Sequence, residues 1–224
     1  MTYGIVISSF NYGHLAAHAI ESVLSQTRKY DKIWFVDDGA GDCTHLEKLY
    51  PQVEFVFRES NLGIVENFNN MLSRVDTDYV MFLGADNWLR SDALAQLDFK
   101  LMPHDKVDIL VYDIIVTGEL KEEIRNIYHA SMFDKDGDYH WTRNGGHHGS
   151  MLYRTELAKK VGGYANNRTS SRTDEDLNLW DKMRTAGATV RHINEALLYY
   201  RRHRENFNKS VSYTHLTLPT ILRV

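Results

Sequence analysis

The sequence has a single cysteine, no long apolar run and no excess of positive charge, and each absence excludes a class of protein. Cys43 cannot form an internal disulfide, so a disulfide framework of the kind found in small secreted domains is excluded. No apolar run reaches the roughly 18 residues that cross a bilayer. The N-terminus has no basic segment followed by an apolar one, so we expect no secretory signal and a cytoplasmic location.

The charge balance argues against a nucleic-acid partner. The 26 Lys and Arg residues are outnumbered by 30 Asp and Glu residues, for a net charge of −4, whereas binding to a phosphate backbone requires a basic face. Hydrophobic residues make up 43% and charged residues 25% of the 224 residues, as in ordinary globular proteins. A chain of this length buries about 70% of its unfolded surface, enough for one stable core.

Strand-like and helix-like segments alternate in the first half of the chain, which predicts βαβ units and a largely parallel sheet. Short apolar runs predict strands, and apolar residues at helical spacing predict helices. The expected strands are residues 4–8, 32–37, 54–58, 79–83 and 109–116, and the expected helices are residues 14–26 and 64–75. Ligands of such sheets bind beyond the carboxyl ends of the strands.

The second half is less regular. Residues 117–148 are polar and are expected to form loops that could include a hairpin. Strands are expected at 150–154, 189–193 and 197–200, and a helix at 175–186. We expect one domain over residues 1–211, with a nucleotide half (1–116) and an irregular acceptor half (117–211). Residues 212–224 do not continue the pattern, and we interpret them as a non-native tail.

Polar clusters follow three of the expected strands, at residues 8–11, 37–39 and 84–87. Asp38 could accept a hydrogen bond from a ribose hydroxyl or from the N–H of a uracil-like base, although the Asp38-Gly39 dipeptide by itself favours a simple turn. Asp86 could bind Mg²⁺ or Mn²⁺ together with diphosphate oxygens, and the alternative is an Asx turn. Both residues would point toward the ligand crevice of the sheet.

Two charged segments in the second half have similar double interpretations. Thr173 and Asp176 match a capping box, yet Asp176 or Glu175 could also serve as a general base. The basic segment 201–204 could be a solvated surface, or its arginines could neutralise a diphosphate while His203 offers an imidazole to the same ion.

In order along the chain, these motifs resemble the inverting nucleotide-sugar glycosyltransferases of the GT-A fold, family 2. The similar segments are the first strand with residues 20–27, the Val-Asp-Asp-Gly segment 36–39 with Asp42 and Thr44, residues 61–69, Glu175-Asp176, and residues 200–203 with Asn206 and Ser210. The resemblance covers residues 3–210.

The resemblance implies an α/β GT-A fold, with a mostly parallel central sheet flanked by helices and a Rossmann-like nucleotide half. It implies metal-assisted inverting transfer of a sugar from a nucleoside-diphosphate sugar, with a UDP-sugar expected, in bacterial surface polysaccharide or glycolipid synthesis. The expected partners are this donor and a saccharide or glycolipid acceptor, the expected cofactor is Mn²⁺ or Mg²⁺, and peripheral contact with the inner membrane face is possible for such an acceptor.

The resemblance also assigns roles to residues. Asp176 is the expected catalytic base, with Glu175 as the second candidate, and Asp86 and His203 are the expected metal ligands. The expected nucleotide-sugar residues are Ser8, Asn11, Asp38, Asn61, Gly63, Asn67, Asn69, Ala85 and Asp86. The expected acceptor residues are Trp141, His147 and His148. The sequence departs from the family at Gly84, which replaces the first Asp of the D-x-D motif.

The missing Asp leaves a second hypothesis open, namely a catalytically silent binding module for sugar nucleotides or glycans with the same fold. A nucleotidyltransferase or a dinucleotide oxidoreductase is less consistent with the sequence, because no glycine-rich phosphate loop follows the first strand.

Overall fold

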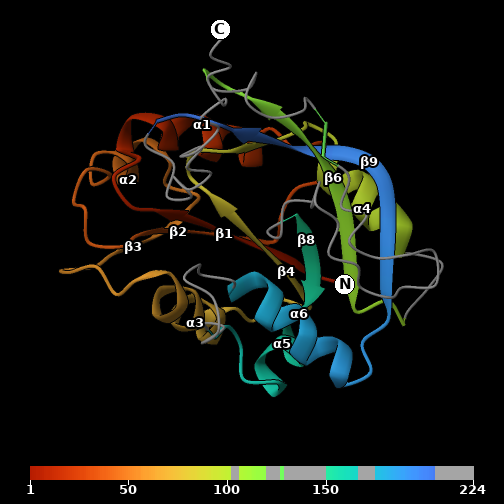
Figure 1. Ribbon diagram of the computed structural model, residues 1–224. Helices are drawn as coiled ribbons and strands as arrows, with labels where there is room; N and C mark the ends of the chain where they lie inside the picture. The colour runs from red at the N-terminus through yellow and green to blue at the C-terminus, as the bar shows by residue number, and fades with distance from the viewer. Residues whose placement is uncertain (102–105, 120–126, 129–149, 166–174, 205–224) are drawn as a thin grey trace, which may run out of the picture.

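The computed structural model describes residues 1–101, 106–119, 127–128, 150–165 and 175–204, and within them one nine-stranded sheet flanked by helices (Figure 1). The strand order is β3-β2-β1-β4-β8-β6-β9-β5, with β7 paired to β6. The strands are β1 (Tyr3–Ser9), β2 (Lys32–Asp37), β3 (Glu54–Phe57), β4 (Tyr79–Gly84), β5 (Trp88–Leu89), β6 (Ile109–Thr117), β7 (Ile127–Tyr128), β8 (Met151–Arg154) and β9 (Val190–Arg201). The helices are α1 (Gly13–Leu24), α2 (Leu46–Leu49), α3 (Ile64–Arg74), α4 (Ala93–Leu101), α5 (Thr155–Lys160) and α6 (Glu175–Thr185).

The sheet has a parallel half and a mixed half. β1 pairs in parallel with β2 and β4, and β2 with β3. β8 is antiparallel to both β4 and β6, so β6 and its parallel neighbour β9 again run in the direction of β1. Six of the nine described strands therefore share one direction, and β5, β7 and β8 oppose it. The mostly parallel sheet expected from the sequence is confirmed.

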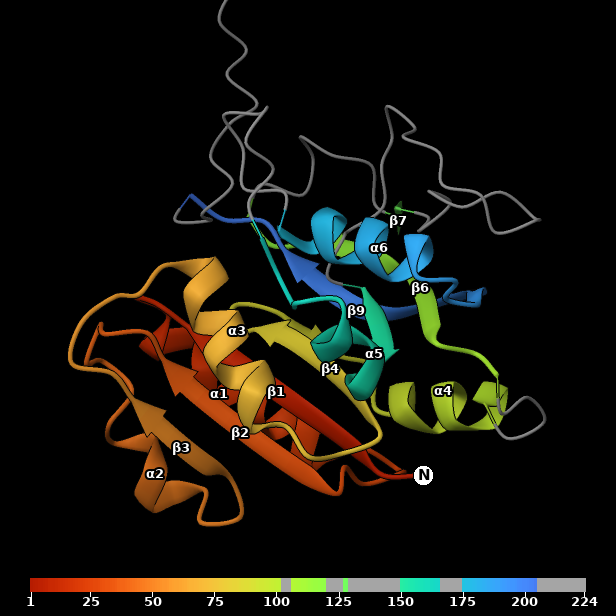
Figure 2. The same ribbon diagram turned by 90° about the horizontal axis from the view of Figure 1, so that it is seen from below.

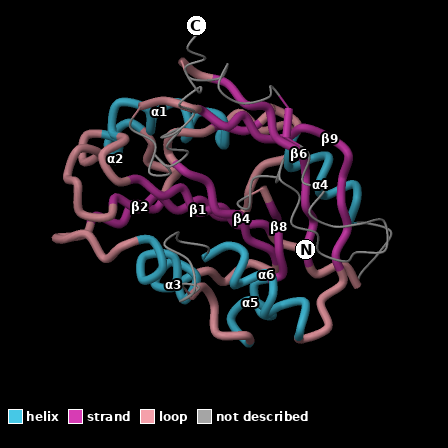
Figure 3. Tube along the Cα trace, in the orientation of Figure 1, coloured by secondary structure: helices cyan, strands magenta, loops and turns pink. Residues whose placement is uncertain are grey.

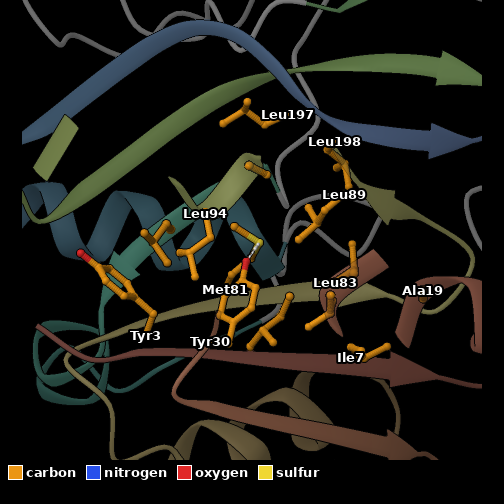
Figure 4. Packing of buried hydrophobic residues seen from close by; sticks show 14 of the residues in the cluster. Tyr3, Ile7, Ala19, Tyr30, Met81, Leu83, Leu89, Leu94, Leu197 and Leu198 are labelled. Carbon is orange, nitrogen blue, oxygen red and sulfur yellow. Dashed lines mark hydrogen bonds between the residues drawn. The ribbon is translucent and has the colours of Figure 1, made fainter. Parts of the chain in front are cut away.

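Helices cover both faces of the sheet, which explains why strands such as β1 are apolar on both sides. One core cluster packs α1 and α4 against the sheet and β9, and includes Ile20, Leu97 and Leu197. Figure 4 shows part of this cluster, where the Tyr30 hydroxyl contacts the sulfur of Met81. The second cluster packs α3, α5 and α6 on the opposite face, in front of the sheet in Figure 2.

The expected elements of the first half are all present, whereas the second half required correction. The two strands expected at 189–193 and 197–200 are a single strand, β9 (Val190–Arg201), as Figure 3 shows. The polar Asn194 and Glu195 interrupt the apolar pattern because they lie in an irregularity, where Tyr112 of β6 pairs with Ile193 but Asp113 pairs with Ala196. The short elements α2, β5 and α5, and the helix α4, were not expected.

None of the helices in the described ranges has both the length and the apolar character that crossing a bilayer requires. The expected domain limit at residue 211 and the tail at 212–224 lie outside the described residues.

Candidate functional site

The carboxyl ends of β1, β2 and β4 are joined by backbone hydrogen bonds beyond the strands. The N–H of Ala85 donates to the carbonyl of Ser8, and the N–H of Asp38 donates to the carbonyl of Ser9, both at 2.9 Å. Residues at the carboxyl ends of three different strands therefore lie at one edge of the sheet, as expected for a parallel arrangement.

The first polar group at this edge is the Arg58 network, which consists of Ser8, Asp38, Arg58, Asn67 and Asn70. The Arg58 guanidinium donates from Nε to Oδ1 of Asn67 (2.9 Å) and from Nη2 to Oδ1 of Asn70 (3.0 Å). Arg58 Nε also lies 3.5 Å from Oδ1 of Asp38. Asn67 Nδ2 in turn donates to the hydroxyl of Ser8 (3.1 Å). The network thus connects the ends of β1 and β2 through helix α3.

Asp38 is buried, and its surroundings act on its pKa in opposite directions. Burial raises the pKa of Asp38, while the hydrogen bond from the Leu62 N–H and the charge of Arg58 lower it. The turn after Asp38 requires Gly39, because φ is +87° and a Cβ would lie 2.4 Å from the backbone carbon of Ser60. The Asp-Gly turn and an inward-facing carboxylate therefore coexist.

The second polar group is the Asp86 network, which consists of Asp86, Asn87, Arg201 and His203. Oδ2 of Asp86 lies 3.3 Å from Nε2 of His203, and Oδ1 of Asp86 accepts a hydrogen bond from Nδ2 of Asn87 (2.9 Å). The N–H of Arg201 donates to Oδ1 of Asn87, and Nε of Arg201 donates to the carbonyl of Asp86, both at 2.9 Å. The end of β9 is therefore fixed to the loop after β4.

Gly84 makes room for this arrangement. A Cβ at position 84 would lie 2.7 Å from Oδ1 of Asp86 and 3.0 Å from Nδ2 of Asn87. The residue that departs from the D-x-D motif is thus the residue that allows Asp86 to fold back toward Asn87 and His203.

Aromatic rings support the Asp86 network from the side of α1. The guanidinium of Arg201 lies 4.8 Å from the ring centre of Trp88, and Nη2 of Arg201 lies 3.0 Å from Nδ1 of His18. Trp88 stacks on both His18 and Tyr199, with ring centres 4.6 and 5.2 Å apart. These contacts fix the direction of the Arg201 side chain.

The remaining expected nucleotide residues have different surroundings. Asn11 is exposed and has φ of 64°, a left-handed conformation that Asn tolerates. Oδ1 of Asn61 accepts the N–H of Gly63 (2.8 Å), directly before α3. Ala85 is buried within the same edge.

Asn69 of α3 is hydrogen-bonded to the segment that follows α5. Its Nδ2 donates to the carbonyl of Tyr164 (2.9 Å), and its Oδ1 accepts the N–H of the same residue (2.8 Å). The structure thus gives Asn69 a structural contact across 95 residues of sequence, which the motif alone did not predict.

Glu175 and Asp176 begin α6 against two tyrosines. The hydroxyls of Tyr153 and Tyr164 share a hydrogen bond of 2.6 Å, and burial together with the charge of Asp176 raises the pKa of both. Burial and the neighbouring Glu175 carboxyl raise the pKa of Asp176 to about 8. A carboxyl group with such a pKa can exchange a proton near neutral pH, as a general base must.

Among the described residues at this edge of the sheet, two groups contain side chains of the kinds that bind metals. Asp86 and His203 offer a carboxylate oxygen and an imidazole nitrogen. Both suit Mn²⁺ when further oxygen ligands complete its coordination shell. Asp37, Asp42 and Cys43 also lie close together. However, both oxygens of Asp37 accept backbone N–H groups, Asp42 accepts the N–H of Gly13, and burial raises the pKa of Cys43 to about 12. We therefore assign this second cluster to the fold of the turn.

Several expected residues cannot be compared with the structure. Trp141, His147, His148 and Thr173 lie outside the described residues. Conversely, the sequence did not single out Arg58, Asn70, Trp88 or His18, which the structure brings into the two networks. Of these residues, only Arg58 has a signal in the sequence, because it directly follows a strand, much as Asp38 and Asp86 follow β2 and β4.

Comparison with known proteins finds relatives among the glycosyltransferases. Residues 4–162 match the family described as "Glycosyl transferase family 2". The putative glycosyltransferase EpsE of Bacillus subtilis is 23% identical over 219 residues, which are 94% of this chain and 76% of EpsE. The putative teichuronic acid biosynthesis glycosyltransferase TuaG of the same organism is 29% identical over 103 residues, 43% of this chain and 41% of TuaG. An uncharacterised glycosyltransferase of Nostoc is 29% identical over 126 residues, 54% of this chain and 39% of its own length.

Solved structures show the same fold. Residues 1–349 of Staphylococcus aureus TarS in complex with UDP-GlcNAc superpose with a TM-score of 0.73 at 18% identity, over 95% of this chain and 62% of that one. A mannosyltransferase of Pyrobaculum calidifontis in complex with GDP-Man and Mn²⁺ gives 0.64 at 14% identity, over 88% of this chain and 56% of that one. The GT-A fold is thereby confirmed, and the chain spans less than two thirds of either solved structure.

Proposed function

Because the chain belongs to glycosyltransferase family 2, we propose that it transfers a sugar from a UDP-sugar to an acceptor hydroxyl with inversion at the anomeric carbon. The observation that carries this proposal is the meeting of the Arg58 network and the Asp86 network at one edge of the sheet. The first network offers groups that suit a nucleoside, and the second offers groups that suit a diphosphate.

In this proposal the Arg58 network binds the nucleoside. Asp38 accepts the N3–H of uracil. The Ser8 hydroxyl, which is hydrogen-bonded to Asn67, belongs to the same binding site. The loop residues Asn11 and Asn61 border the nucleotide. UDP is favoured as the nucleotide because the TarS structures contain UDP and UDP-GlcNAc, while the GDP-Man complex of the mannosyltransferase makes guanine the alternative.

The Asp86 network is proposed to bind the diphosphate end. Asp86 and His203 would hold a divalent ion, and Arg201, fixed by Trp88 and His18, adds positive charge to the same region. A bound Mn²⁺ or Mg²⁺ would supply neutralisation of the charge that develops on the departing diphosphate. Such electrostatic stabilisation, provided by groups already in place, is a large part of catalysis.

Asp176 is proposed as the general base, with Glu175 as the residue that tunes its pKa. Asp176 takes the proton of the acceptor hydroxyl while the hydroxyl oxygen forms a bond to the anomeric carbon. The bond between that carbon and the diphosphate oxygen breaks on the opposite face, so the nucleoside diphosphate leaves with its electron pair. One displacement inverts the configuration, and an α-linked donor gives a β-linked product.

The proposed acceptor is a saccharide or glycolipid of bacterial surface polysaccharide synthesis, with which the relative named for teichuronic acid biosynthesis agrees. Trp141, His147 and His148 remain the proposed acceptor residues. Peripheral contact with the inner membrane face and a cytoplasmic location are part of the same proposal.

The competing function is a catalytically silent binding module, favoured by Gly84 in place of an Asp. Calorimetric titration with UDP, with and without Mn²⁺, followed by a turnover assay on UDP-sugars, separates the two. We expect metal-dependent binding and release of UDP. Metal-dependent binding without turnover, on any donor and with added saccharide acceptors, would favour the silent module.

A further inference from the structure

We infer that Arg58 is a positioning residue for nucleobase recognition, which fixes the Asp38 carboxylate and the Ser8 hydroxyl in the orientation that the base requires. This inference rests on the proposed binding of a nucleoside by the Arg58 network. Arg58 directly follows β3 and belongs to none of the sequence motifs. Helix α3 supplies the two asparagines that hold the Arg58 side chain in place.

The guanidinium of Arg58 is held as a rigid plane. Asn67 and Asn70 lie one turn apart on α3, and each accepts one hydrogen bond from a different nitrogen of the guanidinium, at 2.9 and 3.0 Å. The Arg58 backbone N–H also donates to the carbonyl of Asp37 (3.1 Å). The Arg58 side chain is only 11% exposed, so it is not a mobile surface cation.

The contact with Asp38 determines how that carboxylate is presented. Oδ1 of Asp38 lies 3.5 Å from Nε of Arg58 and accepts the N–H of Leu62 (3.1 Å). The hydrogen bond from Leu62 and the ion pair with Arg58 therefore act on the same oxygen, and together they restrict the rotation of the carboxylate. Burial favours the neutral acid, whereas the hydrogen bond from the Leu62 N–H and the positive charge of Arg58 favour the ionised form. Only the ionised form accepts a hydrogen bond from a base N–H at either oxygen.

The contact with Asn67 extends the effect to Ser8. An amide side chain can present either its oxygen or its nitrogen to a neighbour. Because Oδ1 of Asn67 accepts from Arg58, Nδ2 is directed to the Ser8 hydroxyl (3.1 Å). The hydroxyl oxygen then acts as an acceptor, and its own proton is available for a nucleoside oxygen. Removal of Arg58 would release the Asn67 amide to rotate and would remove this bias.

The central comparison is between UDP and an analogue that differs from it only at N3 of uracil, whose proton Asp38 would accept. UDP has a proton on N3 of uracil, whereas N3-methyl-UDP has none, so the ratio of the two affinities reports whether the carboxylate is in place. We would titrate UDP, N3-methyl-UDP, CDP and GDP calorimetrically in the presence of Mn²⁺. The variants are Arg58→Met, Arg58→Lys and Asn70→Ala. Arg74→Gln is the matched control, because Arg74 is an exposed neighbour of Arg58 that also carries a positive charge.

For the wild type and the Arg74→Gln control, we expect UDP to bind at least tenfold more tightly than N3-methyl-UDP, the effect of about one charge-assisted hydrogen bond. For Arg58→Met, we expect the ratio to approach one. Arg58→Lys should lose most of the preference for UDP over N3-methyl-UDP, because an ammonium group lacks the planar pair of N–H donors that binds Asn67 and Asn70. Asn70→Ala should reduce the ratio less than either. In turnover, the Arg58 variants should raise the donor KM while kcat stays nearly constant.

The outcomes separate this inference from the proposed donor. Wild-type preference for GDP over UDP, abolished in Arg58→Met, would overturn the UDP-sugar donor and support the role of Arg58. Full retention of the UDP ratio in folded Arg58→Met would overturn the inference and leave the donor standing. Equal binding of all four nucleotides by the wild type would overturn both.

Discussion

The pH dependence of turnover tests the assignment of Asp176 as the general base. Burial and the neighbouring Glu175 carboxyl raise the pKa of Asp176 to about 8. Because a base acts only when it is deprotonated, the rate should rise with pH through that pKa. With a pKa of about 8, the ionised fraction is about 1% at pH 6 and about one half at pH 8, which predicts a roughly 50-fold increase in kcat/KM.

The assay measures release of the nucleoside diphosphate at donor concentrations well below KM, with a fixed concentration of Mn²⁺, between pH 5.5 and 9. Under these conditions kcat/KM reports the groups of the free enzyme, which is the state that the structure describes. Glu175→Gln removes the like charge and should shift the rising limb to lower pH, so that this variant is relatively more active at pH 7. Asp176→Asn should abolish the limb together with most of the activity.

Asp181→Asn is the matched control, since Asp181 is an exposed carboxylate on the same helix. This variant should keep the wild-type profile. A wild-type rate that is flat from pH 6 to pH 8, or a folded Asp176→Asn variant with wild-type activity, would refute the assignment of Asp176 as the base.

Three further predictions concern the same residues and their supports. Asp176→Asn should raise the melting temperature at pH 8 but not at pH 3. Between the unfolded pKa of 3.8 and the folded value of about 8, the native state retains a proton that the unfolded chain has lost, so the stability of the wild type falls as pH rises. Equal melting temperatures of the two proteins at pH 8, measured by calorimetry, would contradict this. Gly84→Ala should weaken Mn²⁺-dependent UDP binding, because a Cβ 2.7 Å from Oδ1 of Asp86 displaces that carboxylate; unchanged binding in a titration would show that Asp86 has other room to move. Asn69→Ala should lower the free energy of unfolding by about 1–3 kcal/mol in urea denaturation, since both backbone groups of Tyr164 lose a partner. A change below about 0.5 kcal/mol, on the order of a neutral surface substitution, would contradict the structural role of Asn69.

Much of the parallel half could be predicted from the sequence because its signals are local. An apolar run such as residues 4–8 predicts a buried strand by itself, and the order of strands and helices restricts the sheet topology. The positions of Asp38 and Asp86 followed from the rule that parallel strands present their carboxyl ends at one edge. Their convergence with Ser8 at that edge is confirmed by the backbone hydrogen bonds between β1, β2 and β4.

The remainder depends on contacts that have no local signal. The pairing of Arg58 with Asn67 and Asn70 requires α3 to pack beside the end of β3, and the contact between Asn69 and Tyr164 joins residues 95 positions apart. β9 was interpreted as two strands because polar residues at an irregularity resemble a turn. The supporting ring of Trp88 was missed because β5 is only two residues long, too short for a periodic pattern.

The most direct test of the proposed function is the release of nucleoside diphosphate from a panel of UDP-sugars and GDP-mannose, measured with Mn²⁺ and with a chelator, for the wild type and for Asp86→Asn. We predict release from a UDP-sugar that requires the metal and that falls at least a hundredfold in Asp86→Asn, the scale of a lost electrostatic stabiliser. Binding of UDP without release from any donor, or release that is unaffected by the chelator and by Asp86→Asn, would contradict a metal-assisted transferase built around Asp86.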